Sequence, residues 1–183
     1  MILKKIKEQF ENKRYSKIIR NIGGGSQVYT NGFILGYNAN FILVQETDDF
    51  ELSGYVILLV GDIKKIRFNK YDKYYQKIML LEGKLENVGI DYKIDLSTLK
   101  TAFESIQMQQ LNVIVECEHP DVESFTIGPI KKISKTKVSI QNFDPAGFLD
   151  KELTTIDFKK ITRINFDDRY ANVFGKYLRH RKS

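Results

Sequence analysis

The feature that most constrains the fold of this 183-residue chain is an internal repeat. The pattern Ile-x-x-Ile-x-Phe occurs over residues 63–68 and again over residues 161–166. Further pairs lie at nearly the same separation: Ile42 with Val138, Val44 with Ile140, Gln45 with Gln141, Asp48 with Asp144, Tyr75 with Phe174 and Lys77 with Lys176. An ordered series whose separation drifts only from about 96 to about 99 residues indicates a duplicated unit with short loop insertions.

Each copy is predicted to begin with a helix and to continue with five strands. Apolar residues recur at helical spacing over residues 2–12 and over residues 97–109. The strand candidates of the first copy are residues 15–21, 27–37, 40–46, 51–60 and 63–68, and those of the second are residues 112–118, 124–134, 137–142, 152–158 and 160–166. Turn residues such as Gly23–Gly25 and Asp144–Gly147 separate these runs.

This pattern predicts a mostly β chain with short helices, built from two small bent sheets or barrels. The first unit covers residues 1–82, a polar linker covers residues 83–95, and the second unit with its basic tail covers residues 96–183. Each unit has about 85 residues, a size that can fold alone with marginal stability.

The segment GFILGYN, residues 32–38, resembles the first signature of the Sm-like (LSm) family, Gly-x-Leu-x-Gly-Tyr-Asp followed by Leu-Asn. The positions that fall on this signature are Gly32, Ile34, Gly36, Tyr37, Asn38 and Phe41. Leu59-Val60-Gly61 falls on the second signature, hydrophobic-Arg-Gly. The resemblance implies two tandem, divergent Sm-like units, each of one helix and five strands, in a family that binds RNA and assembles through its strand edges.

The residues depart from that family where it grips a base. Ile42 and Val60 stand in the places of the family's base-contacting Asn and its Arg. In the second copy, Lys132 and Ile133 stand near the Gly36 and Tyr37 places. Because apolar side chains cannot hydrogen-bond a base edge, any grip on RNA is expected to be mainly electrostatic.

A purely structural interpretation of GFILGYN is also sufficient. Gly36 allows a strand bend or bulge, and Asn38 tolerates a left-handed turn conformation. Strand alternation would place Phe33, Leu35 and Tyr37 on one face and Ile34 on the other.

No catalytic residue, metal site or cofactor is predicted, so the chain is not expected to be an enzyme. Cys117 is the single cysteine and alternates with valines, as a strand residue that faces a core does. The Asp48-Asp49 and Asp167-Asp168 pairs suit solvated turns. Gly23–Gly25 lacks the following Gly-Lys-Ser/Thr of a phosphate-binding loop.

Basic, aromatic-rich segments and a net charge of +6 favour contact with phosphates. The candidate nucleic-acid contacts are Tyr37, Asn38, Asn40, Lys64, Lys65, Tyr71, Tyr74, Arg179 and Arg181. Solvated surfaces would explain the same segments, and the match of Tyr75 with Phe174 predicts that these two aromatics pack on the core of each unit.

Two functions follow as hypotheses. The first is a non-catalytic module that binds RNA through basic surfaces. The second is a module for protein–protein interaction or homo-oligomer assembly that uses exposed strand edges. No apolar run approaches the roughly 20 residues of a membrane span, and the charged N-terminal stretch lacks a signal-peptide core, so a cytoplasmic location without membrane contact is expected.

Overall fold

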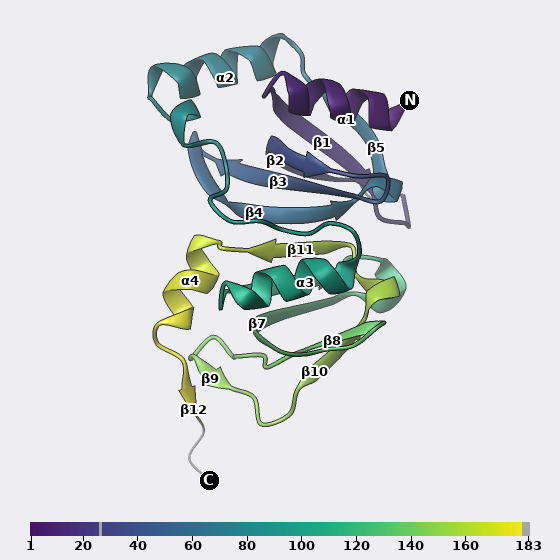
Figure 1. The fold of residues 1–183 in the computed structure, drawn as a ribbon, viewed down its shortest axis with the longest axis vertical. Helices are drawn as coiled ribbons and strands as arrows, with labels where there is room; N and C mark the ends of the chain where they lie inside the picture. The colour runs from purple at the N-terminus through teal and green to yellow at the C-terminus, as the bar shows by residue number, and fades with distance from the viewer. Residues whose placement is uncertain (26, 181–183) are drawn as a thin grey trace. The chain divides into compact units, whose positions relative to one another are not determined.

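The computed structural model describes residues 1–25 and 27–180 (Figure 1). The chain divides into two compact units, Met1–Tyr92 and Lys93–Ser183. The predicted linker, residues 83–95, therefore spans the point of division.

Unit 1 is an open antiparallel sheet with two helices. Its elements are α1 (Ile2–Glu11), β1 (Tyr15–Asn21), β2 (Gln27–Tyr37), β3 (Phe41–Asp48), β4 (Glu51–Leu59), β5 (Ile63–Arg67) and α2 (Lys70–Leu81), with the 3-10 turns η1 (Val60–Asp62) and η2 (Leu85–Asn87). The strands lie in the order β4-β3-β2-β1-β5. Since β5 pairs with β1 and β4 with β3, neither of these outer strands closes the sheet onto the other within the unit.

Helices α1 and α2 cover opposite sides of β1 and β2. Ile6 of α1 packs with Ile18 and Ile34, whereas Met79 of α2 packs with Tyr15 and Phe33. Successive strand residues point to opposite faces, so the two apolar clusters lie on the two sides of the sheet. Burial raises the pKa of Tyr15 to about 12, although a hydrogen bond with Thr47 acts in the opposite direction.

Unit 2 repeats this arrangement. Its elements are α3 (Leu99–Met108), β6 (Asn112–Cys117), β7 (Ser124–Ile133), β8 (Lys137–Ile140), β9 (Phe148–Leu149), β10 (Thr154–Asp157), β11 (Arg163–Phe166), α4 (Arg169–Gly175) and β12 (Arg179–His180), with the 3-10 turns η3 (Pro120–Val122) and η4 (Phe158–Lys160). The main strands lie in the order β10-β8-β7-β6-β11, and the short β9 and β12 pair in parallel. Helix α3 packs on β7 and β8, and α4 packs on β6 and β7.

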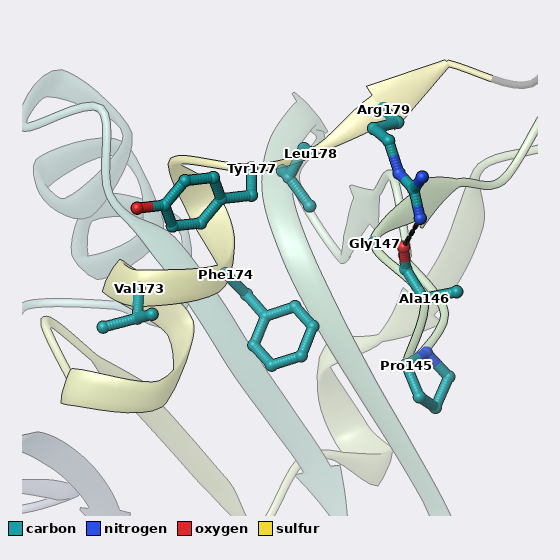
Figure 2. Close-up of a pocket in the computed structure, with 8 residues that line it drawn as sticks. All are labelled: Pro145, Ala146, Gly147, Val173, Phe174, Tyr177, Leu178 and Arg179. Atoms are coloured by element: carbon teal, nitrogen blue, oxygen red, sulfur yellow. Dashed lines mark hydrogen bonds between the residues drawn. The ribbon is translucent and has the colours of Figure 1, made fainter.

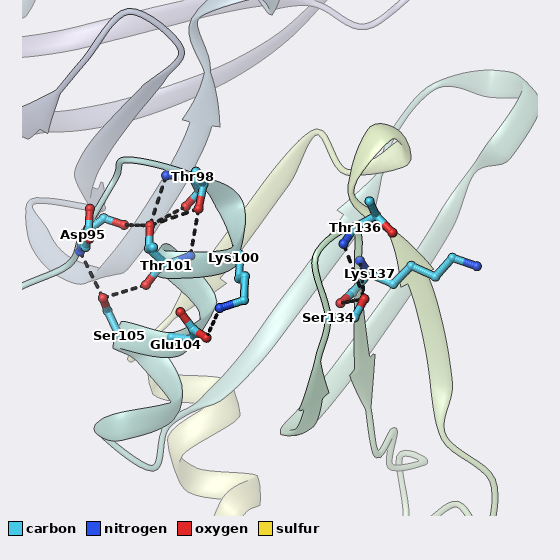
Figure 3. Close-up of polar contacts among 9 residues, drawn as sticks. All are labelled: Asp95, Thr98, Lys100, Thr101, Glu104, Ser105, Ser134, Thr136 and Lys137. Carbon is cyan, nitrogen blue, oxygen red and sulfur yellow. Dashed lines mark hydrogen bonds and ion pairs between the residues drawn. The ribbon is translucent and has the colours of Figure 1, made fainter.

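Local sequence explains where α3 begins. Thr98 is its N-cap, and the Thr98 hydroxyl accepts a hydrogen bond from the Thr101 N–H at 3.1 Å. The Thr101 hydroxyl in turn accepts one from the Thr98 N–H at 3.0 Å, and the Asp95 N–H donates to the Ser105 hydroxyl (Figure 3). The reciprocal Thr98–Thr101 bonds satisfy N–H groups that a helix start leaves without intrahelical partners, and the Asp95 bond ties the preceding segment to the helix.

The two units agree in detail at their second strands. Gly32 and Gly128 lie about 96 residues apart, with φ of 157° and 153°. A Cβ atom at Gly32 would lie 2.0 Å from the Gln45 carbonyl oxygen, and one at Gly128 would lie 2.1 Å from the Gln141 carbonyl oxygen. Glycine is therefore needed at both positions, because the backbone of the neighbouring strand passes directly over them.

The turns that follow these strands also agree. The Asn38 side-chain oxygen accepts hydrogen bonds from the backbone N–H groups of Asn40 and Phe41, both at 2.8 Å. In unit 2 the Ser134 hydroxyl accepts from the N–H groups of Thr136 at 3.4 Å and Lys137 at 3.0 Å (Figure 3). Asn and Ser side chains can both close such a turn, so the two units have the same turn although the residues differ.

The chain is mostly β, but the predicted architecture of two barrel-like Sm-like units, each of one helix and five strands, is wrong. Each unit carries a second α-helix after its main strands, and unit 2 has the additional strands β9 and β12. Across the described residues the main strands form open antiparallel ladders, and no barrel closes. The second helices form because a capping residue, Asn69 or Asp168, follows the last main strand in each unit.

Candidate functional site

The predicted contact Tyr37 is half-buried and packs against the core of unit 1. Its ring packs edge-to-face on Phe10, with 5.5 Å between centroids, and it contacts the cluster that contains Ile34. The prediction that Tyr37 shares a face with Phe33 is wrong, since the register of β2 against β3 shifts between Ile34 and Gly36. The predicted bulge at Gly36 is thus confirmed, and it turns Tyr37 to the opposite side.

The neighbouring candidates form the β2–β3 turn. Asn38 does not use the left-handed conformation that an asparagine tolerates, since its φ is not positive, and its side-chain oxygen closes the turn instead. Asn40 is exposed, and its carbonyl accepts a hydrogen bond from the Val60 N–H of η1 at 2.8 Å. The side-chain oxygen of Asn38 is therefore committed to local structure.

A basic surface lies on the same side of the sheet as α2, over the part of that side that the helix does not cover. Lys65 of β5, Ile19 of β1 and Tyr29 of β2 stand opposite one another in the ladders. Directly opposed residues in antiparallel strands share a face, so these three side chains form one row. The Lys17 ammonium lies 4.2 Å from the centre of the Tyr29 ring, which is 52% exposed. We call Lys17, Tyr29 and Lys65 the basic face.

Arg67 connects the basic face to the start of α2. Its guanidinium donates to both carboxylate oxygens of Asp72, at 2.9 and 2.7 Å. Asp72 also accepts from the Asn69 N–H at 2.8 Å, which completes a capping box. Burial alone would raise the pKa of Asp72, but the hydrogen bonds from Arg67 and Asn69 outweigh it and lower that pKa. Arg67 is therefore neutralised and serves to hold α2 beside the sheet.

The exposed side of α2 carries the other aromatic candidates. Tyr71 and Tyr74 are 67% and 65% exposed, and the Lys70 ammonium lies 5.1 Å from the centre of the Tyr71 ring. Tyr75 points the other way and stacks on Tyr15, with 4.5 Å between the ring centroids. In unit 2, Phe174 stacks on Phe143 at 5.6 Å. The prediction that Tyr75 and Phe174 pack on the core of their units is confirmed.

A shallow groove of about 380 Å³ lies along α2, where Lys73, Gln76 and Lys77 line it together with Arg14. Phe68 lines it, with the Arg14 guanidinium 5.2 Å and the Lys73 ammonium 5.8 Å from the ring centre. Arg14 forms an ion pair with Glu8, whereas Lys77 in the same groove is exposed. The groove therefore places further cations on the surface of α2. None of the three residues of the basic face lines it.

Unit 2 carries different side chains at the positions of the basic face. Phe125 stands where unit 1 has Tyr29, and the opposed residues are Glu116 and Arg163. The Glu116 carboxylate lies 3.3 Å from the Arg163 guanidinium, so the charges compensate. The next row, at Ile114 and Ile127, is covered by α4 and belongs to an apolar cluster. The basic face is therefore a property of unit 1 alone.

The remaining candidates do not extend the basic face. Lys64 is exposed on β5 beside Lys65. Arg179 lies in unit 2, where its guanidinium lies 4.1 Å from the centre of the Phe148 ring, and Arg181 lies outside the described residues. Cys117 is buried, as predicted for a strand residue that faces the core.

Lys17 and Tyr29 were not among the residues predicted from the sequence to contact nucleic acid. Both lie in strands whose bounds were predicted correctly, residues 15–21 and 27–37. Alternation within β1 and β2, combined with a short hairpin register, could have placed them on one face. Their neighbour Lys65 comes from β5, whose pairing with β1 no local pattern reveals.

No protein-family model, curated protein or solved structure matches this chain. Over the part of the chain that is described, no group of three or more His, Cys, Asp or Glu residues is placed to hold a metal ion. Within the same residues, no helix is long and apolar enough to cross a membrane.

Proposed function

We propose that unit 1 binds single-stranded RNA through the basic face and the adjoining exposed side of α2, without catalysis. The observation that carries this proposal is the position of Tyr29, an exposed ring on a sheet face with the Lys17 ammonium 4.2 Å from its centre and Lys65 in the same row. Lys70 and Tyr71 continue the same combination at the start of α2.

The chemistry suits an unpaired strand. Bases stack on exposed aromatic rings because every base has a π face, while lysines neutralise the phosphates between them. The three residues of the basic face offer no amide or guanidinium that could read a base edge in two places, so the binding tolerates different sequences. The resemblance of residues 32–41 to the Sm-like signature also favours RNA as the ligand class. A cytoplasmic location is part of this proposal.

The test is fluorescence anisotropy with a labelled, mixed-sequence single-stranded RNA. We expect binding that weakens at least roughly 10-fold between about 50 and 200 mM salt, because counterion release drives it. Tyr29→Ala should weaken binding by roughly 10-fold, which corresponds to the loss of one base stack, whereas Tyr29→Phe should retain most of the affinity.

Phe125→Ala provides the matched control, since Phe125 occupies the position of Tyr29 in unit 2. It should leave the affinity for RNA within about twofold of the parent. Absence of binding at low salt would refute the proposal, and so would an equal loss of affinity in Tyr29→Ala and Phe125→Ala.

The edge strand of unit 1 argues against the alternative function, which is assembly through exposed strand edges. Strand β5, at the end of that sheet, has only five residues and exposes Lys64 and Lys65. Short, lysine-rich edge strands resist pairing with another chain. Light scattering that shows a monomer at micromolar concentration would agree with the RNA proposal, whereas a stable homo-oligomer would favour assembly.

A further inference from the structure

Unit 2 contains an apolar hollow of about 610 Å³ that the proposed RNA surface does not involve (Figure 2). It lies between the turn that precedes β9 and the segment that runs from the end of α4 into β12. The described residues that line it are Pro145, Ala146, Gly147, Val173, Phe174, Tyr177, Leu178 and Arg179. The volume is in the range of sites that hold small organic ligands.

The two walls of the hollow are held in place by hydrogen bonds. The Asp144 side-chain oxygen accepts from the N–H groups of Ala146 at 2.9 Å and Phe148 at 3.0 Å. The Arg179 N–H donates to the Gly147 carbonyl at 2.7 Å, which joins one wall to the other. A ligand would therefore meet a preformed site and would not have to order it.

The interior of the hollow is apolar, and part of it faces water. Val173 and Tyr177 are 46% and 71% exposed. Phe174, whose ring stacks on Phe143, points with Leu178 into the space between the walls (Figure 2). Covering such side chains with an apolar ligand body releases water from both surfaces and is favourable.

Among the residues that the structure describes, one cation stands at the rim. The Arg179 guanidinium is fixed between the Phe148 ring, whose centre is 4.1 Å away, and the Ala146 carbonyl, to which it donates one hydrogen bond. A guanidinium has five N–H donors, so this bond leaves donors for a carboxylate. The described lining residues include no carboxylate that would neutralise this charge.

We propose that this hollow binds a small amphipathic carboxylic acid, with its apolar body against Val173, Phe174 and Leu178 and its carboxylate on Arg179. The apolar lining alone would take a neutral body equally well. The fixed Arg179 guanidinium at the rim selects the anion, because a charge-assisted pair with a carboxylate is stronger than a neutral hydrogen bond. The proposal does not depend on RNA binding by unit 1.

The test uses 1-naphthoate as the probe and its neutral counterpart 1-naphthalenemethanol, each titrated into the full chain labelled with ¹⁵N. We expect saturable naphthoate-induced shifts of backbone amides in residues 146–147 and 173–179. Arg179→Met should weaken naphthoate binding roughly 10-fold and change naphthalenemethanol binding by less than about twofold, since only the anion loses a charge-assisted hydrogen bond.

Two further variants make the result decisive. Val173→Trp, which fills the hollow from an exposed position, should weaken the binding of both probes. Arg169→Met removes an exposed cation from the other end of α4 and should change neither. The proposal is overturned if naphthoate gives no saturable shifts in these residues, if Arg179→Met and Arg169→Met weaken naphthoate equally, or if Val173→Trp leaves its binding intact.

Discussion

Gly32 and Gly128 show how single residues carry the repeated fold. Each lies where the backbone of the next strand crosses the second strand of its unit, at the position a Cβ atom would occupy. In the sequence, Gly32 falls on the Sm-like signature, whereas no motif marks Gly128 as its equivalent. The equivalence became visible only through the neighbouring carbonyls of Gln45 and Gln141, a pair that the repeat had already matched.

We predict that Gly32→Ala and Gly128→Ala each lower the free energy of unfolding by about 3 kcal/mol or more, because a contact near 2 Å forces the strands apart. Urea unfolding followed by circular dichroism measures this. Gly61→Ala is the matched control, since a Cβ atom there has nothing within 4 Å. A loss in Gly32→Ala as small as that in Gly61→Ala would show that the strand crossing is looser than described.

The elements divide into those that local patterns revealed and those they did not. The bounds of β1 and β2 were predicted correctly, because alternating apolar residues and turn residues both mark them. Helix α2 was missed, since its buried side combines Asp72, Tyr75 and Gln76 with a single apolar Met79. Without an apolar stripe at helical spacing, only the Asn69 and Asp72 capping box indicated a helix.

The ion pair of Asp72 with Arg67 links α2 to β5, and its removal tests that link. Asp72→Asn keeps an oxygen that can accept from the Asn69 N–H, so the cap survives while the charge is lost. We expect a loss of about 1–3 kcal/mol in the free energy of unfolding at neutral pH, discounted because the Arg67 side chain is partly exposed.

The pH dependence of stability gives this prediction a second readout. The folded protein holds the pKa of Asp72 below its ordinary value, so the contribution of the pair is present above that value and is lost as pH falls through the folded pKa. Asp72→Asn should therefore show a smaller loss of stability than the parent as the solution is acidified from neutral pH. Asp48→Asn, at the exposed end of β3, should follow the parent. An acid limb as steep in Asp72→Asn as in the parent would contradict the assignment.

At the scale of the whole chain, two units of one topology carry different surfaces. Unit 1 has exposed lysines around Tyr29, whereas unit 2 has a compensated Glu116–Arg163 pair at the same positions and an apolar hollow beyond them. The repeat could be found from sequence because matched strand residues such as Ile66 and Ile164 are apolar and buried in both units. The divergence of the two surfaces could not be found from sequence, since the pairing of the strands decides which side chains share an exposed face.

This divergence separates a local site from a general attraction of a basic chain for RNA. Lys17→Gln with Lys65→Gln removes two charges from the basic face, and Lys131→Gln with Lys132→Gln removes two exposed charges from β7 of unit 2. Both double variants lower the net charge equally.

If RNA lies on the basic face, the Lys17 and Lys65 double variant should weaken binding at low salt by roughly 10-fold or more. It should also reduce the slope of log affinity against log salt by about 1.4, because two phosphate contacts are lost. The second should change the affinity by less than about twofold. Anisotropy titrations at several salt concentrations give both quantities, and an equal loss in the two variants would mean that net charge, not the basic face, attracts the RNA.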